Sequence, residues 1–346
     1  MCSDKEKIQY RYETMNKDEL IKLLEDTIIP ASCTDMTPYL QPIADALMEV
    51  MPVPLYRFRT INEYSLSAFD KDLIFFSRAK DFNDPYDSLL TAPSLESFLS
   101  LDSKDQFSLM SICQNLLIKG YEIPECVKNV IPLDLLKSLV TSLKDKSMGV
   151  CNGNDMIQLK RIVEDLQNRV RFFEVEARNC NSFACFSEDI TSLTMWAHYA
   201  DYHKGYALSY DLKPLIKQPS GGIMVLPIIY SSQRYDATNF LASCLGMNTD
   251  IPVKRLDVLD VIKSTLHKSP AWSYEKEWRL INTIDMNSPH PSLDYSPSGI
   301  YYGTQISEIN KKILHAIAVE KGIKEFEMYI DKSSYGYKMK IRPFSV

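Results

Sequence analysis

Glycine is scarce in this chain, and its scarcity limits the folds that the chain can adopt. Only 11 of the 346 residues are glycine. The glycine-rich fingerprints of a Rossmann dinucleotide-binding fold (GxGxxG), a P-loop NTPase (GxxxxGK[ST]) and an α/β-hydrolase (GxSxG) do not occur in the sequence. Folds in which glycines cradle a phosphate or shape a nucleophile elbow are therefore not indicated.

Composition indicates a globular chain without a membrane partner. Hydrophobic residues make up 45% of the chain and charged residues 24%, which are ordinary values for a globular protein. The longest apolar stretches, such as residues 223–229, are too short to cross a bilayer, and no signal peptide is recognised. We therefore expect a cytoplasmic protein whose eight dispersed cysteines are reduced.

The charge balance bears on partners. The net charge of −6 and the pI near 5.5 argue against nucleic acid as a non-specific ligand, because such binding needs a basic face. A local basic groove stays compatible with these values.

Helical periodicity predicts two helices before residue 51 and a long helical stretch in the middle of the chain. The first helix begins at Asn16 or Asp18, either of which can cap it, and the second covers residues 38–51. Residues 94 to about 179 are expected to be mostly helical and to include an amphipathic helix at 155–178. Short helices are expected at 192–200 and 258–267.

Runs rich in aromatic and β-branched residues predict the strands. They lie at residues 55–59, 72–77, 182–186, 205–210, 223–229, 275–281, 313–319, 326–330 and 337–342. Because helices do not separate these strands regularly, we expect the α+β class with a mixed or antiparallel sheet core. The chain would then consist of a helical N-terminal extension (1–50) and a main domain (51–346) with a helical insertion at about 94–178.

Two polar clusters precede the insertion. In the strand at 55–59, Arg57 and Arg59 share one face and two aromatic residues share the other. Ser77 ends the next strand, and Asn83-Asp84 with the following proline make good turn chemistry. Solvated arginines and a turn would explain these residues without any ligand.

Two further clusters follow the insertion. Trp196 and His203 belong to an aromatic block that is either a core helix or a set of stacking faces with polar tips. If residues 275–281 form a strand, Glu275, Glu277 and Arg279 line one of its faces. Two carboxylates beside a guanidinium are either a salt-bridge ladder or a site.

Two cysteines and two histidines have the spacing of a zinc site. Cys180, Cys185, His198 and His203 have the spacing C-x4-C-x12-H-x4-H, which is formally that of a zinc finger. However, Asp189 occupies the position of the finger's core aromatic residue, and a chain with a large core needs no structural metal. We expect no metal site.

In this order, the four clusters resemble a bacterial family catalogued as domain of unknown function 2971. The matching blocks are 55–59 (LYRFR), 74–85 (ending FNDP), 185–205 (CFS…MWAHYADYHKG) and 272–279 (WSYEKEWR). The resemblance covers about residues 50–346 and implies that the clusters form one unit. We therefore expect Arg57, Asn83, His203 and Glu277 to lie within one ligand's span of each other.

The same order also resembles the Arg–Ser–Glu-x-Glu layout of ADP-ribosyltransferases. That resemblance implies that Arg57 or Arg59 holds the pyrophosphate or ribose of NAD, which would be a substrate, and that Ser77 orders the site. Glu277 would stabilise an oxocarbenium-like transition state, and Glu275 would activate an acceptor whose identity is open.

The remaining candidates complete this hypothesis. The residues that could stack on nicotinamide or adenine are Trp196, Tyr199 and Tyr274. Asn83, Asp84 and Arg279 are further candidate ligand-binding residues, and His203 is a further candidate catalytic residue.

Two other functions stay open. The first is a hydrolase or nuclease that uses Asp84, His198, His203 and Glu277, with or without a divalent metal. The second is a sensing module in which arginines and aromatic residues bind a nucleotide or peptide without turnover.

Overall fold

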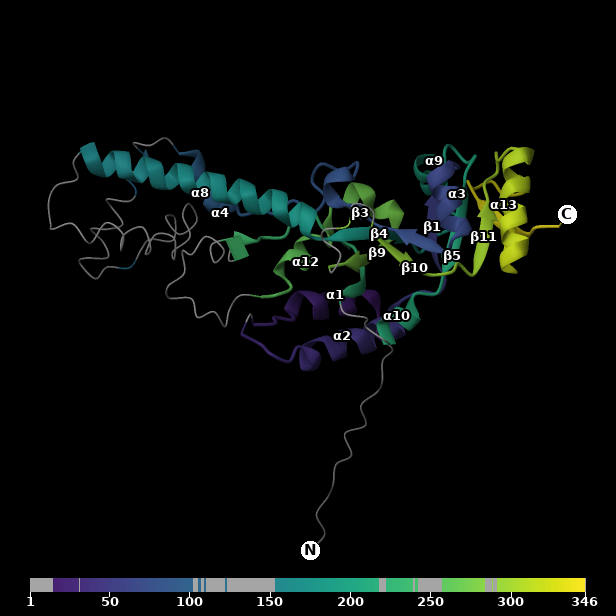
Figure 1. Cartoon of the computed structure of the whole chain (residues 1–346), viewed down its shortest axis with the longest axis horizontal. Helices are drawn as coiled ribbons and strands as arrows, with labels where there is room; N and C mark the ends of the chain where they lie inside the picture. Colours follow the sequence, from purple (N-terminus) through teal and green to yellow (C-terminus); the bar gives the residue numbers. More distant parts are fainter. Residues whose placement is uncertain are drawn as a thin grey trace, which may run out of the picture.

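The computed structural model describes residues 15–30, 32–101, 153–217, 222–238, 257–283 and 291–345, with a few further positions between these ranges. Within this part of the chain, one long sheet runs through the middle of the molecule, and helices lie on two sides of it (Figure 1).

Nine strands form this sheet, which confirms the α+β class with a mixed sheet. In spatial order they are β13 (Met339–Pro343), β12 (Lys324–Ile330), β11 (Gly299–Tyr302), β5 (Tyr206–Tyr210), β1 (Leu55–Arg59), β4 (Ser182–Ser187), β9 (Glu277–Asn282) and β6 (Ile223–Pro227), with β3 (Ser77–Arg78) beside β4. All neighbours are antiparallel except β11 and β12. The basic strand β1 therefore lies inside the sheet, between β5 and β4, and not at its edge.

The parallel pair is joined by a helix where a strand was expected. The prediction of a strand at 313–319 is wrong, since these residues lie in α13 (Glu308–Lys321). Ser307 caps the start of this helix, and Gly322 ends it in the left-handed conformation (φ 63°). The apolar run is compatible with either structure, but a connection between parallel strands needs a crossover element.

The two N-terminal helices form as predicted and pack under the sheet (Figure 1). In α1 (Lys17–Asp26), Asn16 and Glu19 form a capping box. Leu20 and Leu24 of α1 share one hydrophobic cluster with Ile43 and Leu47 of α2 (Thr37–Val50) and with buried residues of the central strands. The extension thus contributes to the same core as the sheet.

Several other boundaries differ from the prediction. The strand expected at 72–77 is broken at Phe76, so that β2 (Leu73–Phe75) pairs with β10 (Ser292–Asp294), which was not predicted. The strand expected at 223–229 also divides, and β7 (Ile229–Tyr230) pairs in parallel with β8 (His267–Lys268). The remaining short helices are α3 (Glu63–Asp70), α9 (Leu193–Tyr199), α10 (Lys213–Lys217), α12 (Asp260–Ser264) and the 3₁₀ helices η1 (Ala79–Asp81) and η3 (Pro270–Glu275).

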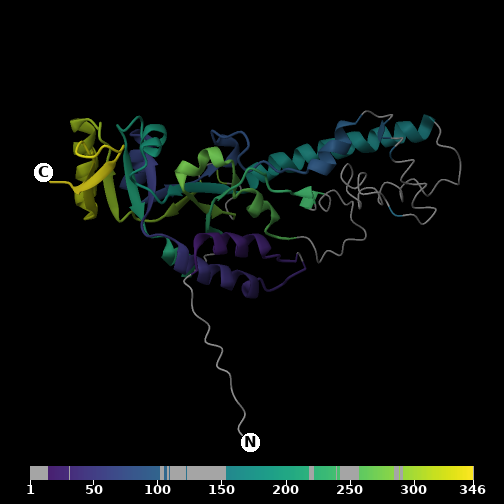
Figure 2. The same cartoon turned by 180° about the vertical axis from the view of Figure 1, so that it is seen from behind.

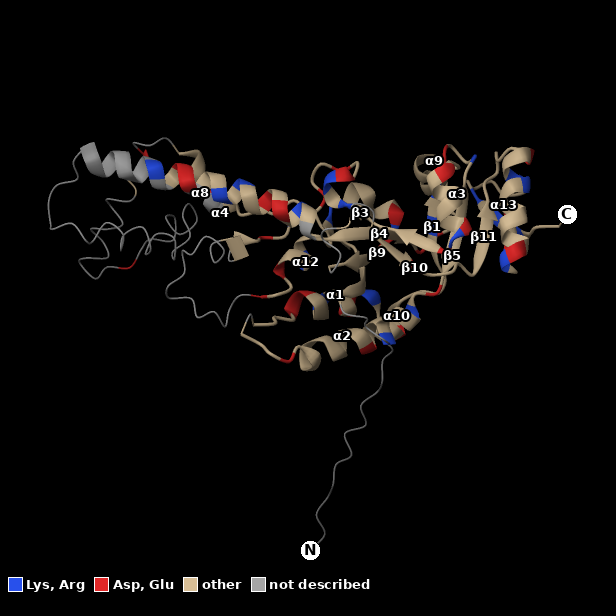
Figure 3. Cartoon of the chain, viewed as in Figure 1, with Lys and Arg blue, Asp and Glu red and all other residues tan. Residues whose placement is uncertain are grey.

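Only the two ends of the predicted helical insertion belong to the described residues. They are α4 (Pro93–Ser100) and the 28-residue helix α8 (Gly153–Cys180), which extends away from the sheet in both views (Figures 1 and 2). Acidic and basic residues are interleaved along α8 (Figure 3). The residues between these helices lie almost wholly outside the described part of the chain. Among the described helices, none has a stretch that is long and apolar enough to span a bilayer.

A buried ion pair fastens α1 to the segment around α12. Lys263 Nζ lies 2.6 Å from Asp257 Oδ2, and both side chains are buried. The same ammonium donates to the carbonyl oxygens of Glu25 and Thr27 at the end of α1, while Asp257 Oδ1 accepts from the backbone N–H of Ile29. Two segments more than 200 residues apart in the sequence are thereby held together.

We expect Asp257→Ala to destabilise the fold by about 3–5 kcal/mol, because Lys263 would keep a buried charge without its carboxylate. Asp165→Ala serves as a control, since its ion pair with Arg169 is exposed and worth about 0–1 kcal/mol. Urea unfolding of both variants measures the difference. Equal losses of stability in the two variants would contradict a stabilising role for the buried Asp257–Lys263 ion pair.

Candidate functional site

A cavity of about 430 Å³ opens beside the central strands. Because side chains alternate along a strand, Tyr56 and Phe58 of β1 face this cavity while Arg57 faces the opposite side. Phe82, Phe186 and Tyr199 add further aromatic walls. The volume lies in the range of small-molecule sites.

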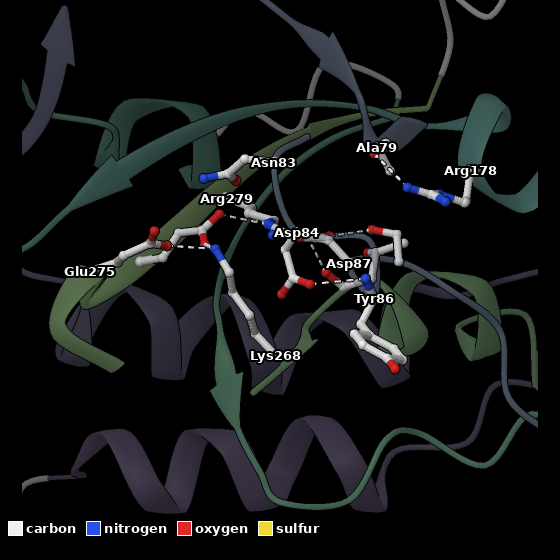
Figure 4. Close-up of polar contacts among 12 residues, drawn as sticks. Ala79, Asn83, Asp84, Tyr86, Asp87, Arg178, Lys268, Glu275 and Arg279 are labelled. Carbon is white, nitrogen blue, oxygen red and sulfur yellow. Dashed lines mark hydrogen bonds and ion pairs between the residues drawn. The ribbon is translucent and has the colours of Figure 1, made fainter. Parts of the chain in front are cut away.

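The floor of the cavity is built from paired charges that centre on Lys268 (Figure 4). Lys268 Nζ donates to Glu275 Oε2 at 2.5 Å and to Glu277 Oε2 at 2.9 Å. All three side chains are almost fully buried. The two carboxylates thus share one ammonium, which holds Glu275 Oε2 and Glu277 Oε2 close to each other.

A second cation lies deeper. Arg279 Nε donates to Glu277 Oε1 at 2.7 Å, and its two terminal nitrogens bind both oxygens of Asp87 at 2.9 and 2.5 Å. Arg279 and Asp87 are each only 1% exposed in their side chains, so this bidentate pair is removed from water. The chain of charged contacts runs without a break from Glu275 to Asp87 (Figure 4).

Glu275 reaches this network from outside the strand, so its predicted place on the strand face is wrong. It ends η3, and Lys276 then takes a left-handed conformation (φ 44°) before β9 begins at Glu277. Ser187 Oγ donates to the carbonyl of Glu275 at 2.6 Å, and the N–H of Glu277 donates to Tyr230 Oη at 2.9 Å. These two bonds fix the backbone on both sides of the kink.

The two carboxylates have opposite pKa shifts. Burial raises the pKa of Glu275; Lys268 lowers it and Glu277 raises it again, and the net shift is upward. Burial acts on Glu277 in the same sense, but Arg279 and Lys268 outweigh it and hold the pKa of Glu277 well below its usual range. Such a divided pair is typical of sites in which two acids have different roles.

Tyr199 connects the network to the mouth of the cavity. Its hydroxyl donates to Glu275 Oε1 at 2.5 Å, and Asn83 Nδ2 lies 3.5 Å from the same hydroxyl. On the same side, His198 Nδ1 lies 3.0 Å from Tyr274 Oη. Burial, and then Glu275, raise the pKa of the Tyr199 phenol, so Tyr199 stays a neutral donor.

Of the residues selected from the sequence for the candidate functions, six line the cavity. They are Asn83, His198, Tyr199, Glu275, Glu277 and Arg279. Of the four residues expected within one ligand's span, Asn83 and Glu277 meet there, and neither Arg57 nor His203 lines the cavity. Arg57 is buried on the other face, where its Nη2 donates to the carbonyl of Phe75 at 2.6 Å.

The other selected residues have structural surroundings of their own. Trp196 is fully buried and donates to the carbonyl of Ile190 at 2.7 Å. Asp84 accepts from the N–H of Tyr86 at 2.9 Å, which is the expected turn contact. Ser77 pairs with Phe183 in the sheet. Tyr274 lies beside His198 without lining the cavity.

His203 belongs to a tight loop between α9 and β5. Asp201, Tyr202 and His203 are all left-handed (φ 46°, 53° and 69°). A Cβ on Gly205 would overlap the carbonyl oxygen of Arg59, and one on Gly303 would overlap that of His203. Backbone therefore packs directly on backbone here, which only glycine permits.

Arg59 lines a second cavity of about 290 Å³. Phe58 and Tyr199 line both cavities, so the two adjoin.

Sequence reasoning missed Asp87 and Lys268. Asp87 follows the Asn83-Asp84-Pro85 turn by two residues, so extending that block would have included it. Lys268 has no local signal, because β8 is only two residues long. Among the described residues, no group of three or more histidine, cysteine, aspartate or glutamate side chains has an arrangement that could hold a metal ion.

The fold and the site define an α+β protein with a charge-lined, aromatic-walled cavity. Residues 195–280 match the model of the family described as "Protein of unknown function (DUF2971)". The match includes Tyr199, Lys268, Glu275, Glu277 and Arg279. No curated protein and no solved structure matches the chain.

The opposite pKa shifts predict opposite effects on stability. The lowered pKa of Glu277 stabilises the fold at neutral pH, and this contribution is lost as the pH falls below the ordinary glutamate value of about 4.3. Glu277→Gln should therefore cost about 3–5 kcal/mol at pH 7 and less in acid. The raised pKa of Glu275 has the opposite effect on stability. Above the ordinary glutamate pKa, ionising Glu275 costs more free energy in the folded protein than in the unfolded chain.

Glu275→Gln should consequently leave stability at pH 7 unchanged or higher. Urea unfolding of both variants between about pH 2 and 8 gives the comparison. A Glu277→Gln penalty that does not shrink in acid would refute the assignment.

Proposed function

We propose that the protein is an enzyme that binds a nucleoside or nucleotide and transfers its sugar from a ring nitrogen to water or another acceptor. The observation that carries the proposal is the position of Glu275. Its carboxylate has a raised pKa, lies in a cavity of ligand size, and is held by Tyr199 and Lys268. A base with a pKa closer to neutrality is better suited to proton transfer at neutral pH.

The lining of the cavity favours a flat ring that is neutral or positively charged. Aromatic side chains offer stacking faces on several sides. The lysine and arginine that line it, Lys268 and Arg279, are both paired with carboxylates, so a ligand anion would meet no free ammonium or guanidinium there. The nicotinamide ring of NAD carries a positive charge and is one ring of this kind.

The proposed reaction uses the two carboxylates differently. As the bond between the sugar carbon and the ring nitrogen breaks, the ring leaves with the bonding electrons and positive charge develops on the sugar. A positively charged ring such as nicotinamide leaves as a neutral molecule, whereas a neutral ring takes up a proton from solvent as it leaves. The negative side of the cavity, Glu275 and Glu277, stabilises that charge. The oxygen of the water or acceptor hydroxyl then bonds to the sugar carbon, and Glu275 takes the proton that this oxygen loses.

ADP-ribosyl transfer is one reaction within this class, and it would rest here on the carboxylates alone. Neither Arg57 nor Ser77 lines the cavity, so the arginine and serine roles of the Arg–Ser–Glu-x-Glu layout find no support at these positions. NAD stays a candidate substrate because of its charged ring and its glycosidic bond.

Glu275→Gln should lower kcat/KM for glycosidic cleavage by about 100-fold or more, because the variant cannot accept a proton. Release of nicotinamide from NAD, and of free base from nucleosides, would be measured. In the unsubstituted protein, the rate should fall as the pH drops through the raised pKa of Glu275, above the ordinary glutamate range.

Glu320→Gln is the matched control, because Glu320 is exposed on α13, away from the cavity. Activity that survives in Glu275→Gln, or no cleavage of any nucleoside, nucleotide or NAD by the intact protein, would end the proposal.

A further inference from the structure

A neutral ring must gain a proton as its glycosidic bond breaks, whereas a charged ring leaves without one. The two carboxylates Glu275 and Glu277 do not deliver this proton, because both carry negative charge in the proposed reaction and Glu275 accepts a proton. A positioned side chain that passes a proton to the reacting group speeds a reaction by about 10²–10⁴-fold. A donor for the departing ring is therefore expected among the other residues that line the 430 Å³ cavity.

Most hydrogen-bond donors of this cavity hold their protons too firmly for such a role. Burial acts to lower the pKa values of Lys268 and Arg279, but their carboxylate partners outweigh it and raise both. Burial raises the pKa values of the Tyr56 and Tyr199 phenols, and the Tyr199 hydroxyl already donates to Glu275. These four side chains therefore bind and orient a ligand without giving up a proton.

Two smaller groups are excluded in the same way. Burial, and then Glu277, raise the pKa of the Cys185 thiol well above its usual range. The Ser187 hydroxyl is fully buried and donates to the carbonyl oxygen of Glu275. Neither group is a suitable acid at neutral pH.

Among the described residues that line the cavity, only His198 carries an imidazole. It lies near the end of α9 and is exposed, so solvent can return a proton to it. Its Nδ1 lies 3.0 Å from Tyr274 Oη, while Nε2 has no hydrogen-bond partner in the described part of the chain. Burial, and then Glu275, raise the pKa of the Tyr274 phenol, so Tyr274 is a neutral partner that orients the ring and leaves Nε2 available.

The imidazole and the base are held by the same two elements. Tyr199 follows His198 in α9 and donates to Glu275 Oε1 at 2.5 Å, while Glu275 follows Tyr274 in η3. Two adjacent contacts between α9 and η3 therefore fix His198 and Glu275 relative to each other. Both residues line one cavity of small-molecule size, so a single nucleoside in that cavity can contact both.

We propose that His198 delivers the proton to the departing ring, so that the site cleaves nucleosides with neutral rings, such as purines, as well as those with charged rings. This role rests on the proposed function, since it exists only where a glycosidic bond is cleaved. The imidazolium gives its Nε2 proton to a nitrogen of the ring, and the ring keeps the electrons of the broken bond. The neutral imidazole keeps its Nδ1 hydrogen bonded to Tyr274 Oη and takes a proton from solvent before the next turnover.

The test compares two substrates that differ in the charge of the ring. Guanosine has a neutral ring, whereas the ring of 7-methylguanosine is positively charged and leaves without protonation. His198→Gln should lower kcat/KM for guanosine by about 100-fold or more, but that for 7-methylguanosine by less than about 3-fold. Release of free base from each nucleoside by the full-length chain would be measured.

Two further variants separate the proton transfer from a structural effect. Tyr274→Phe removes the hydrogen bond to His198 Nδ1, and it should lower guanosine cleavage by about 10-fold while sparing 7-methylguanosine. Lys204→Gln removes an exposed charge from the loop after α9 without changing the cavity lining, and it should cleave both nucleosides at the unsubstituted rate. A retained rate with 7-methylguanosine also shows that each variant is folded.

The outcomes distinguish the role of His198 from the proposed function. Equal losses with both nucleosides in His198→Gln would overturn that role and leave the proposed reaction standing. The same holds if the unsubstituted protein cleaves charged rings alone. A selective loss of guanosine cleavage would support both, and no cleavage of either nucleoside or of NAD by the unsubstituted protein would overturn both.

Discussion

The buried sharing of Lys268 by Glu275 and Glu277 is the interaction on which the rest of the site depends. Removing a charge from water costs several kcal/mol, and only close opposite charges offset that cost. Lys268 comes from β8, Glu275 from η3, and Arg279 from β9, while Asp87 comes from a turn almost 200 residues earlier. Lys268, Glu277, Arg279 and Asp87 each offset the buried charge of a neighbour, so the cavity floor depends on the tertiary fold that brings them together.

The same interaction links function to stability. Glu277 is tied on both oxygens and acts mainly as a fixed negative charge, whereas Glu275 lies nearer the mouth and receives its second bond from a tyrosine hydroxyl. The chain therefore divides two tasks between residues that are two positions apart. The left-handed Lys276 between them makes this division possible, because it lets η3 end and β9 begin within one residue.

Much of this architecture could be predicted from local sequence, and the rest could not for physical reasons. Capping at Asn16 and the alternation that separates Phe58 from Arg57 are local properties, and both were correct. Which face of β1 meets the cavity depends on tertiary packing and not on the local sequence. The prediction therefore grouped Arg57 with Asn83 and Glu277, although Phe58 faces the cavity. Lys268 lies in a two-residue strand without periodicity, and it was not recognisable until its carboxylates were placed around it.

The backbone contacts at Gly205 and Gly303 restrict how this site can differ among related chains. They fix the loop after α9 against the ends of β1 and β11 with no side chain between them, and this loop directly follows α9, whose Met195, His198 and Tyr199 line the cavity. The ion pairs of Lys268, Glu277, Arg279 and Asp87 in the charged floor are a second constraint, since each of these residues holds a buried charge that a neighbour offsets. Variation in ligand choice should therefore concentrate at Asp81, Asn83 and His198, which are exposed at the cavity and belong to neither constraint.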